Sequence, residues 1–403
     1  MKRQLWILPL LFVTVTAAGP SLPRQAAVAL SSVLKGATDR GDLPGVVVTV
    51  VNKDGTLYDG AFGVSSTLSR KPMTKDAIFN IASMTKPITS VAVMMLVDEG
   101  KLTLDDDVAK FLPKYKDPVV ISKFNEADGS YETRPAKRPI TIRHLLTHTS
   151  GFGYAFASRM MTTITTKTGK AELDLPLLFD PGESWAYGPS TRVLGQVVEA
   201  ISGQKLDAFL DARIFGPLGM HDTSYLVPVA KSPRVVAGNT RNKDGKLVEL
   251  PTMTPLPANV AGDGGLYSTA SDYGLFLRML LNHGALNDKR ILSEKSVAAM
   301  LQPQTGNIVV KEQQSTNLGL SHNFPLGAGK DKWGLGFQLA AEQLPNRRSP
   351  GSGTWAGIFN THFFIDPSKE LGVVMMMQVL PFYDEAAMNV CTGVEEAVYK
   401  NVK

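Results

Sequence analysis

The stretch FNIASMTKPITSVAVMMLVDEG, residues 79–100, joins a strand-like apolar run to a long helix-like run. Ser83 and Lys86 stand at this junction, and a spacing of three on a helix brings both side chains onto one face. The start of a helix, with its free backbone N–H groups, favours negative charge that develops on a nearby oxygen. A lysine can take the proton of a serine when its surroundings keep part of it neutral. The pair is therefore either a nucleophile with its base or an N-cap serine beside a solvated lysine.

The S-x-x-K pattern alone does not decide between these alternatives, because the chain contains it three times, at Ser32/Lys35, Ser83/Lys86 and Ser202/Lys205. Ser202 lies at a Gly-marked helix end, and Ser32 lies in an amphipathic segment with no strand before it. Only Ser83 follows a strand-like run and precedes a long apolar helix. The chain has no G-x-S-x-G sequence, which argues against an α/β-hydrolase nucleophile elbow.

The composition of the chain is that of an ordinary globular protein. Its 403 residues are 43% hydrophobic and 20% charged, enough for one large core or two domains. The single cysteine, Cys391, permits no intrachain disulfide, and we expect it to be a small buried apolar residue. Because no block of Lys and Arg occurs, we expect no nucleic-acid partner.

The N-terminal segment has the pattern of a secretory signal peptide. Lys2 and Arg3 precede an apolar run over residues 5–15 and small residues up to Ala18. The apolar run is too short to span a bilayer about 30 Å thick. We therefore expect residues 1–18 to be removed and the protein to be exported, periplasmic or secreted, without stable membrane association. An uncleaved membrane anchor is the alternative.

The order of the predicted elements indicates an α+β fold. Strands are expected at both ends of the chain, at 46–52, at a hairpin partner after Asp54-Gly55, and at 333–340, 360–366 and 370–380. Helices are expected at 87–100, 141–151, 190–203, 205–219, 269–284 and 384–402. We predict an antiparallel sheet flanked by helices, formed by residues 22–95 and 330–403, with a mainly helical domain inserted at 96–329. The long polar loops 117–139 and 303–332 are placed to border a cleft between the two domains.

Two further patterns favour structural roles. His144 and His148 are four residues apart, but the first is not followed by the Glu of a zinc metalloprotease helix, so capping or packing is favoured over a metal site. The GDGG sequence at 262–265 lacks the ending of a phosphate-binding loop, and we expect a tight turn near the site.

Five ordered blocks of sequence resemble the penicillin-recognising serine hydrolases. They are IASMTK (81–86), ITIRHLLTHTSGFGY (140–154), WAYGPSTRVLGQVVEAISG (185–203), AGDGGLYSTASDYGLFLRMLL (261–281) and GTWAGIFNTHFFIDPSKELGVVMMMQ (353–378). Within that class, the chain resembles most the family VIII carboxylesterases, relatives of the class C β-lactamases. The resemblance covers nearly all of the chain after the signal segment. It implies a β-lactamase/transpeptidase-like fold with the active site in the cleft between the two domains.

The resemblance also assigns residues to roles. Ser83 matches the serine that is acylated, Lys86 its partner lysine, and Tyr187 the tyrosine of the second motif. A phenol in this position can carry a proton from the serine to the leaving group, so we assign the base to Lys86 and Tyr187 together. The backbone N–H groups of Ser83 and Ile358 match the oxyanion hole. The resemblance implies no metal and no cofactor.

The chain departs from the β-lactamase pattern at two places. The asparagine expected two residues after Tyr187 is Pro189, which has no side-chain amide, and the neighbouring Ser190 is not known to replace it. The K-T-G motif is replaced by Trp355-Ala356-Gly357, where the indole offers apolar area and one N–H donor but no charge. We therefore expect these three residues to bind substrate, although Trp355 could simply pack at a sheet edge. Other cations that could replace the missing lysine are Lys330, Lys332 and Arg347.

The sequence thus predicts a serine esterase that hydrolyses short-chain carboxylic esters through an acyl-enzyme on Ser83, with a small-molecule ester as its partner. A β-lactamase or D-amino-acid peptidase is less favoured, because it would use a cationic third motif. An acyltransferase on the same fold is not distinguished from an esterase by any sequence feature. A non-enzymatic penicillin-interacting protein is least favoured, because the chain retains Ser83, Lys86 and Tyr187 together.

Overall fold

The computed structural model describes residues 22–251, 260–325 and 327–401. Its first strand, β1 (Gly45–Asn52), is apolar at nearly every position because both of its faces are buried. Val46, Val48 and Val50 point into one hydrophobic cluster, while Val47 and Val51 point into another on the opposite face. Successive side chains of a strand alternate between faces, so a strand that is covered on both sides needs apolar residues at nearly every position.

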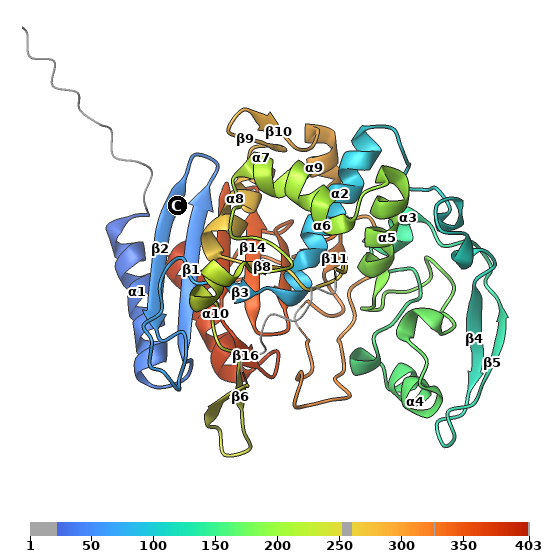
Figure 1. The fold of residues 1–403 in the computed structure, drawn as a ribbon, viewed down its shortest axis with the longest axis horizontal. Coiled ribbons are helices and arrows are strands. Elements are labelled where there is room, and N and C mark those ends of the chain that lie inside the picture. The colour runs from blue at the N-terminus through green and yellow to red at the C-terminus, as the bar shows by residue number, and fades with distance from the viewer. Residues whose placement is uncertain (1–21, 252–259, 326, 402–403) are drawn as a thin grey trace, which may run out of the picture.

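β1 belongs to a seven-stranded sheet in which every pairing is antiparallel. In spatial order the strands are β11 (Lys332–Trp333), β12 (Gln338–Leu339), β13 (Gly353–Gly357), β14 (Thr361–Asp366), β15 (Leu371–Met376), β1 and β2 (Thr56–Gly63). The hairpin predicted at Asp54-Gly55 joins β1 to β2. Because β1 also pairs with β15, the two ends of the chain meet in one sheet, coloured blue and red in Figure 1.

Helices cover both faces of this sheet. On one face, α1 (Arg24–Asp39) and α10 (Glu385–Tyr399) share a hydrophobic cluster with β1 and β15. On the other face, α2 (Thr85–Asp98) and α8 (Ala270–Leu281) belong to a larger cluster that continues into the middle of the chain. The predicted α+β fold, an antiparallel sheet flanked by helices, is therefore confirmed.

Most of the remaining elements lie between α2 and the C-terminal strands in the sequence, and α3, α4, α5, β4 and β5 gather at the end of the molecule away from β1 and β2 (Figure 1). The helices are α3 (Ile142–Leu146), α4 (Arg159–Thr168), α5 (Ser190–Ser202), α6 (Leu206–Leu210), α7 (Gly216–Leu218) and α9 (Glu294–Met300). The short strands are β3 (Phe79–Asn80), β4 (Val119–Phe124), β5 (Tyr131–Pro135), β6 (Asn239–Arg241), β7 (Leu247–Glu249), β8 (Tyr267–Ser268), β9 (Ala285–Leu286), β10 (Lys289–Arg290) and β16 (Val379–Leu380).

Two helices end where the sequence predicted, just before a glycine. Gly203 caps α5 and Gly219 caps α7, and both glycines adopt a left-handed conformation that ends a helix at little cost. Four expectations need correction in extent. The helix expected at 141–151 is only the five residues of α3, and the one expected at 205–219 is divided into α6, a π-helical turn and α7. The single strand expected at 333–340 is instead an antiparallel pair, β11 and β12, and the one expected at 370–380 is divided into β15 and β16, which pairs with β6.

The prediction of an irregular loop at 117–139 is wrong. β4 and β5 form an antiparallel hairpin there, and Asp128-Gly129 lies in the turn between them. The strands are largely exposed and polar, so they lack the apolar alternation by which a strand is usually recognised. The strand β13 was also not predicted, because a five-residue segment with glycine at both ends has weak strand propensity.

The predicted signal peptide at residues 1–18 lies outside the described residues, and export stays a prediction. None of the helices in the described ranges has the length and apolar character that crossing a membrane requires. The division into domains at residues 95 and 330 also stays a prediction.

Candidate active site

Ser83 lies in a 3₁₀ turn, Ala82–Met84, between strand β3 and helix α2. β3 is held by pairing with β8, and the N–H of Ile81 donates to the carbonyl of Leu266 at 3.0 Å. Ala82 has a φ of 43°, a left-handed conformation that is unusual for a residue with a side chain. The strand-to-helix junction predicted from the sequence is therefore present, and tertiary contacts hold Ser83 in its turn.

Lys86 lies one helical turn after Ser83, and its side chain is only 2% exposed. Its ammonium nitrogen Nζ lies 3.0 Å from Ser83 Oγ and donates to the backbone carbonyl of Asp263 at 2.8 Å. It also lies 4.8 Å from the centre of the Tyr187 ring, a distance at which a cation is attracted to the aromatic face. Lys86 is thus buried and directed at Ser83, which excludes the alternative of a solvated lysine.

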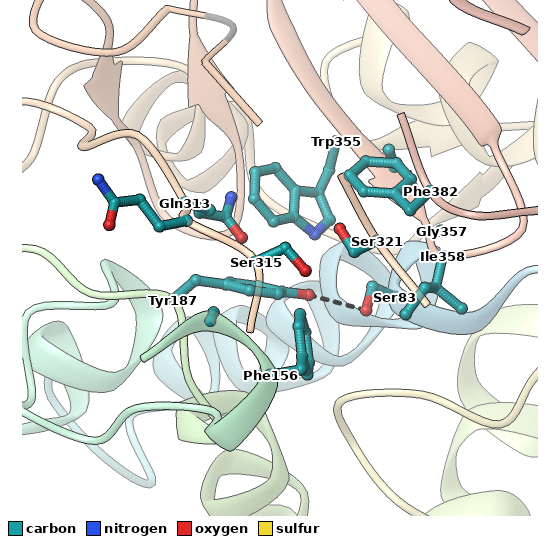
Figure 2. A pocket seen from close by; sticks show the side chains of 13 residues that line it. Ser83, Phe156, Tyr187, Gln313, Ser315, Ser321, Trp355, Gly357, Ile358 and Phe382 are labelled. Atoms are coloured by element: carbon teal, nitrogen blue, oxygen red, sulfur yellow. Dashed lines mark hydrogen bonds between the residues drawn. The ribbon is translucent and has the colours of Figure 1, made fainter. Parts of the chain in front are cut away.

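Tyr187 reaches Ser83 from the segment before α5. Its hydroxyl donates to Ser83 Oγ at 2.7 Å, a contact drawn as a dashed line in Figure 2. The segment is fixed by backbone hydrogen bonds from Tyr154 to Tyr187 at 3.1 Å and from Ala186 to His148 at 3.0 Å. The Tyr187 ring packs between the rings of His148 and Trp355, with centroids 5.3 and 5.0 Å away.

Trp355-Ala356-Gly357, which replaces the K-T-G motif, lies on β13, and this strand runs next to the Ser83 turn. A Cβ added at Gly357 would lie only 2.4 Å from the carbonyl oxygen of Ile81, so a glycine is needed for this close approach. The approach brings Ile358, just beyond the strand, into the same pocket as Ser83. The backbone N–H groups of these two residues are the pair that the family resemblance implies for the oxyanion hole.

A pocket in front of Ser83 opens to solvent. Its described lining carries no formal charge at neutral pH, and Figure 2 shows Trp355 and Phe382 on one side of it and Phe156 on the other. The lining residues are Ser83, Phe156, Ala157, Tyr187, Gln313, Gln314, Ser315, Ser321, Trp355, Ala356, Gly357, Ile358 and Phe382. The segment 303–332, predicted to border a cleft, contributes four of them.

Trp355 is 5% exposed and is more than a sheet-edge residue. Its ring packs on those of Tyr187 and Trp333, with centroids 5.0 and 4.8 Å away. Its indole N–H is buried and has no hydrogen-bond partner among the described residues. A donor in this state is available to an acceptor atom of a bound molecule.

The structure places the other sequence candidates away from the pocket. Ser190 shares a 2.8 Å hydrogen bond with Ser150 in the interior, so its hydroxyl does not replace the amide missing at Pro189. None of the three candidate cations is among the lining residues. Lys330 pairs with Glu342, Arg347 pairs with Glu395, and Lys332 donates to the carbonyl of Gly306.

The two histidines have structural roles, as predicted. His144 Nδ1 accepts the N–H of Thr141 and completes a capping box at α3. Burial lowers the pKa of His144 to about 4. His148 is fully buried beside Trp185 and Trp333, and burial followed by the charge of Lys86 lowers its pKa well below the ordinary value. In the described part of the chain, no three His, Cys, Asp or Glu side chains are placed to hold a metal ion. Cys391 is buried, as expected, and burial raises its pKa to about 12.

Three residues near the site were missed as functional candidates. Asp263 was seen only as part of the GDGG turn, whose predicted position near the site is confirmed by the hydrogen bond from Lys86. Its carboxylate is bound by Tyr154 and Arg192. Tyr154 is the last residue of the second resembling block, and Arg192 lies in the first turn of the helix after Tyr187, so both positions lie within sequence that the resemblance covers.

Comparison with known proteins agrees with this fold. A family model described as "Beta-lactamase" matches residues 30–389, and the chain therefore belongs to the beta-lactamase family. Lovastatin esterase from Penicillium rubens is 29% identical, with 87% of this chain and 93% of the esterase covered. Monacolin J acid methylbutanoyltransferase from Aspergillus terreus is 27% identical, with 92% and 95% covered. The solved structure of a simvastatin synthase (LovD) mutant from the same fungus has a TM-score of 0.81 at 26% identity, covering 94% of this chain and 95% of that one.

Proposed function

We propose that this protein is a serine esterase that hydrolyses short-chain carboxylic esters through an acyl-enzyme on Ser83. One observation carries the proposal: Ser83 Oγ lies between Lys86 Nζ at 3.0 Å and the Tyr187 hydroxyl at 2.7 Å, at the wall of an open pocket. A serine with two proton-carrying neighbours in hydrogen-bond contact has what nucleophilic catalysis requires. The similarity to an esterase over most of both chains supports the same class of reaction.

In the first step, Ser83 Oγ attacks the carbonyl carbon of the ester, and its proton passes to the pair formed by Lys86 and Tyr187. Negative charge develops on the carbonyl oxygen, where the N–H groups of Ser83 and Ile358 stabilise it; one such donor typically contributes about 3 kcal/mol. The bond between the carbonyl carbon and the alcohol oxygen then breaks, and Tyr187 returns the proton to the departing alcohol. Water releases the acid by the same steps in the second half of the reaction.

The pocket supports a neutral substrate. Its lining combines aromatic rings with uncharged polar groups, so a carboxylate bound there would find no cation in the described lining. Trp355 stands where a β-lactamase has the lysine that binds an anionic lactam. We therefore favour an ester with a short neutral acyl group over a β-lactam, and we assign the chain to the family VIII carboxylesterases within the beta-lactamase family.

The experiment that tests this function compares initial rates on p-nitrophenyl butyrate and on a chromogenic cephalosporin, for the wild type and for Ser83→Ala. We expect the ester to be the better substrate and Ser83→Ala to lose its turnover. Wild-type turnover by Ser83→Ala would reject the nucleophile. A far better rate on the cephalosporin would reject the esterase while keeping Ser83 as the nucleophile.

An acyltransferase is the second candidate, because a methylbutanoyltransferase is similar over nearly the whole chain. Its reaction differs only in the molecule that takes the acyl group from Ser83. Adding an alcohol to the p-nitrophenyl butyrate reaction distinguishes the two activities. A hydrolase yields mainly butyrate, whereas an acyltransferase yields mainly the new ester at modest alcohol concentration.

A further inference from the structure

Next to Lys86, and not among the residues that line the pocket, the chain has a buried carboxylate that the proposed reaction does not use. The side chain of Asp263 is only 4% exposed. Its oxygen Oδ1 accepts the Nε–H of Arg192 at 3.0 Å. Its oxygen Oδ2 accepts from the hydroxyl of Tyr154 and lies 3.0 Å from Arg192 Nη2 in an ion pair. All these contacts come from segments distant in sequence, so tertiary structure assembles the cluster around Lys86.

The Asp263 cluster acts on Lys86 by two routes. The backbone carbonyl of Asp263 accepts a hydrogen bond from Lys86 Nζ at 2.8 Å, so anchoring the side chain also fixes the group that orients Lys86. The second route is charge. Burial alone would raise the pKa of Asp263, but the charges of Lys86 and Arg192 bring it below its ordinary value. Asp263 is therefore an anion that both cations attract.

The turn that carries Asp263 is held close to two helices. A Cβ added at Gly262 would lie 2.4 Å from the carbonyl oxygen of Thr191 in α5, so this position requires glycine. The hydroxyl of Thr89 in α2 donates to the carbonyl of Gly262 at 2.8 Å. Because α2 also carries Lys86 and α5 carries Arg192, the turn fixes the carboxylate relative to both cations.

The other titratable groups around Lys86 are less able to set its charge. Burial raises the pKa of Tyr154 well above its ordinary value, and His148 is kept neutral because burial and Lys86 lower its pKa. Tyr187 faces Ser83 and belongs to the reacting group itself. Glu172, whose pKa is raised by burial, interacts with Lys86 and Arg192 but accepts its hydrogen bond from the backbone of Ala155. Asp263 and Arg192 remain the charged pair that acts on Lys86 most directly.

We propose that Asp263 and Arg192 are positioning residues that set the charge around Lys86 and thereby the pH above which Ser83 becomes a nucleophile. The carboxylate of Asp263 attracts the Lys86 ammonium, and the positive charge of Arg192 offsets part of this attraction. The inference rests on the proposed function only in taking Ser83 as the nucleophile.

If the proposal is correct, replacing Asp263 and replacing Arg192 should shift the acid limb of the pH–rate profile in opposite directions. Asp263→Asn removes an anion, so deprotonation of Lys86 or of Tyr187 becomes easier, whichever of them is the base. Arg192→Gln removes a cation, so the same deprotonation becomes harder. Each substitution should move the acid limb of the pH–rate profile by about one pH unit, downward for Asp263→Asn and upward for Arg192→Gln.

The rate of phosphonylation of Ser83 by a fluorophosphonate is the readout, because it does not depend on the natural substrate. Ser83 Oγ forms a bond to phosphorus, the phosphorus–fluorine bond breaks, fluoride leaves, and the serine proton passes to the base. The full-length protein is labelled across a pH series, and the labelled peptide is identified by mass. Arg192→Lys, which keeps the positive charge but not the two-point contact of the guanidinium with Asp263, serves as the control and should move the limb less than Arg192→Gln does.

Opposite shifts of the two limbs, with the double variant Asp263→Asn/Arg192→Gln returning near the wild type, support the proposal. Limbs that move in the same direction, or that stay in place while only the plateau falls, overturn it and leave the cluster a merely structural role. If Asp263→Asn does not fold, as judged by its thermal transition, the comparison of Arg192→Gln with Arg192→Lys decides the same question. A wild-type protein that is labelled at Ser83 but does not hydrolyse p-nitrophenyl butyrate would contradict the proposed esterase alone.

Discussion

The hydroxyl of Tyr187 donates a 2.7 Å hydrogen bond to Ser83 Oγ, although 104 positions separate the two residues in the chain. The contact joins the turn before α2 to the segment before α5. The N–H of Ala186 donates to the carbonyl of His148, and this bond holds the Tyr187 segment in register with the chain after α3. Since Lys86 contacts the same oxygen from within α2, Ser83 Oγ has two proton-carrying neighbours, and each is held by a different part of the fold.

Replacing Tyr187 with phenylalanine removes only the hydroxyl that contacts Ser83. We expect kcat to fall by about 10²–10⁴-fold with little change in KM, because proton transfer is lost while the ring keeps its packing. The loss should be larger for an alkyl butyrate than for p-nitrophenyl butyrate, since p-nitrophenolate leaves without being protonated. Tyr115→Phe is the matched control, because the Tyr115 hydroxyl is buried without a partner in the described structure. A wild-type kcat for Tyr187→Phe on both esters would remove Tyr187 from the mechanism.

Substituting Gly357 with alanine should separate the oxyanion hole from the nucleophile. The added Cβ would lie 2.3 Å from Thr361 Oγ1 and 2.4 Å from the carbonyl oxygen of Ile81, so β13 must shift away from the Ser83 turn. We expect kcat to fall by about 10²-fold or more, as for loss of one oxyanion donor. Gly36→Ala in α1 is the control, since its Cβ meets only the end of the Arg40 side chain, 3.0 Å away. If both variants retain wild-type kinetics, Ile358 does not serve the reaction.

Truncating Trp355 to alanine should change both substrate choice and stability. The indole occupies the pocket wall between Tyr187 and Trp333, so its removal enlarges the space in front of Ser83. We expect the optimum acyl length to move from butyrate toward longer p-nitrophenyl esters. The free energy of unfolding in urea should fall by about 3–5 kcal/mol, as for other buried aromatic residues. An unchanged chain-length profile would place the acyl group elsewhere.

His362 should make the protein sensitive to acid. Burial, with a smaller contribution from Arg348, lowers the pKa of His362 from 6.5 to about 3. The unfolded chain takes up a proton on this imidazole below about pH 6.5, whereas the folded chain does so only near pH 3, so the free energy of unfolding falls as the pH drops across this window.

His362→Phe removes that proton and keeps the contact between the ring and Phe382. We expect the difference in unfolding free energy between about pH 7 and about pH 5 to be smaller in this variant than in the wild type, measured by denaturant titration at each pH. His144 and His148 remain in both proteins and supply the same background. An equal or larger pH dependence in the variant would show that His362 titrates normally in the folded state.

The sequence predicted the parts of the fold that obey local rules. Strand propensity predicted the valine-rich run of β1, and turn geometry predicted the hairpin at Asp54-Gly55. Helix capping predicted the glycine that follows α5. The hairpin of β4 and β5 was not predicted, because its strands are exposed and therefore lack the alternating apolar residues by which a strand is recognised.

In the site, Ser83 and Lys86 could be predicted because they are neighbours on one helical turn. Tyr187 could be predicted only through the family resemblance, since no local rule distinguishes it from any other tyrosine in a loop. The Asp263 cluster could not be predicted, because its members lie 71 and 109 positions apart and meet only through packing. The same reason explains why Lys330 and Arg347 seemed available from sequence but are paired with carboxylates elsewhere.

The most direct test of the central claim is the mass of the protein during turnover. Wild-type protein mixed with p-nitrophenyl butyrate and quenched in acid should gain the mass of one butyryl group, and fragmentation of the digested protein should place it on Ser83. Ser83→Ala treated in the same way should gain nothing. A butyryl group on another residue, or ester hydrolysis with the same rate and no dependence on Ser83, would contradict the account.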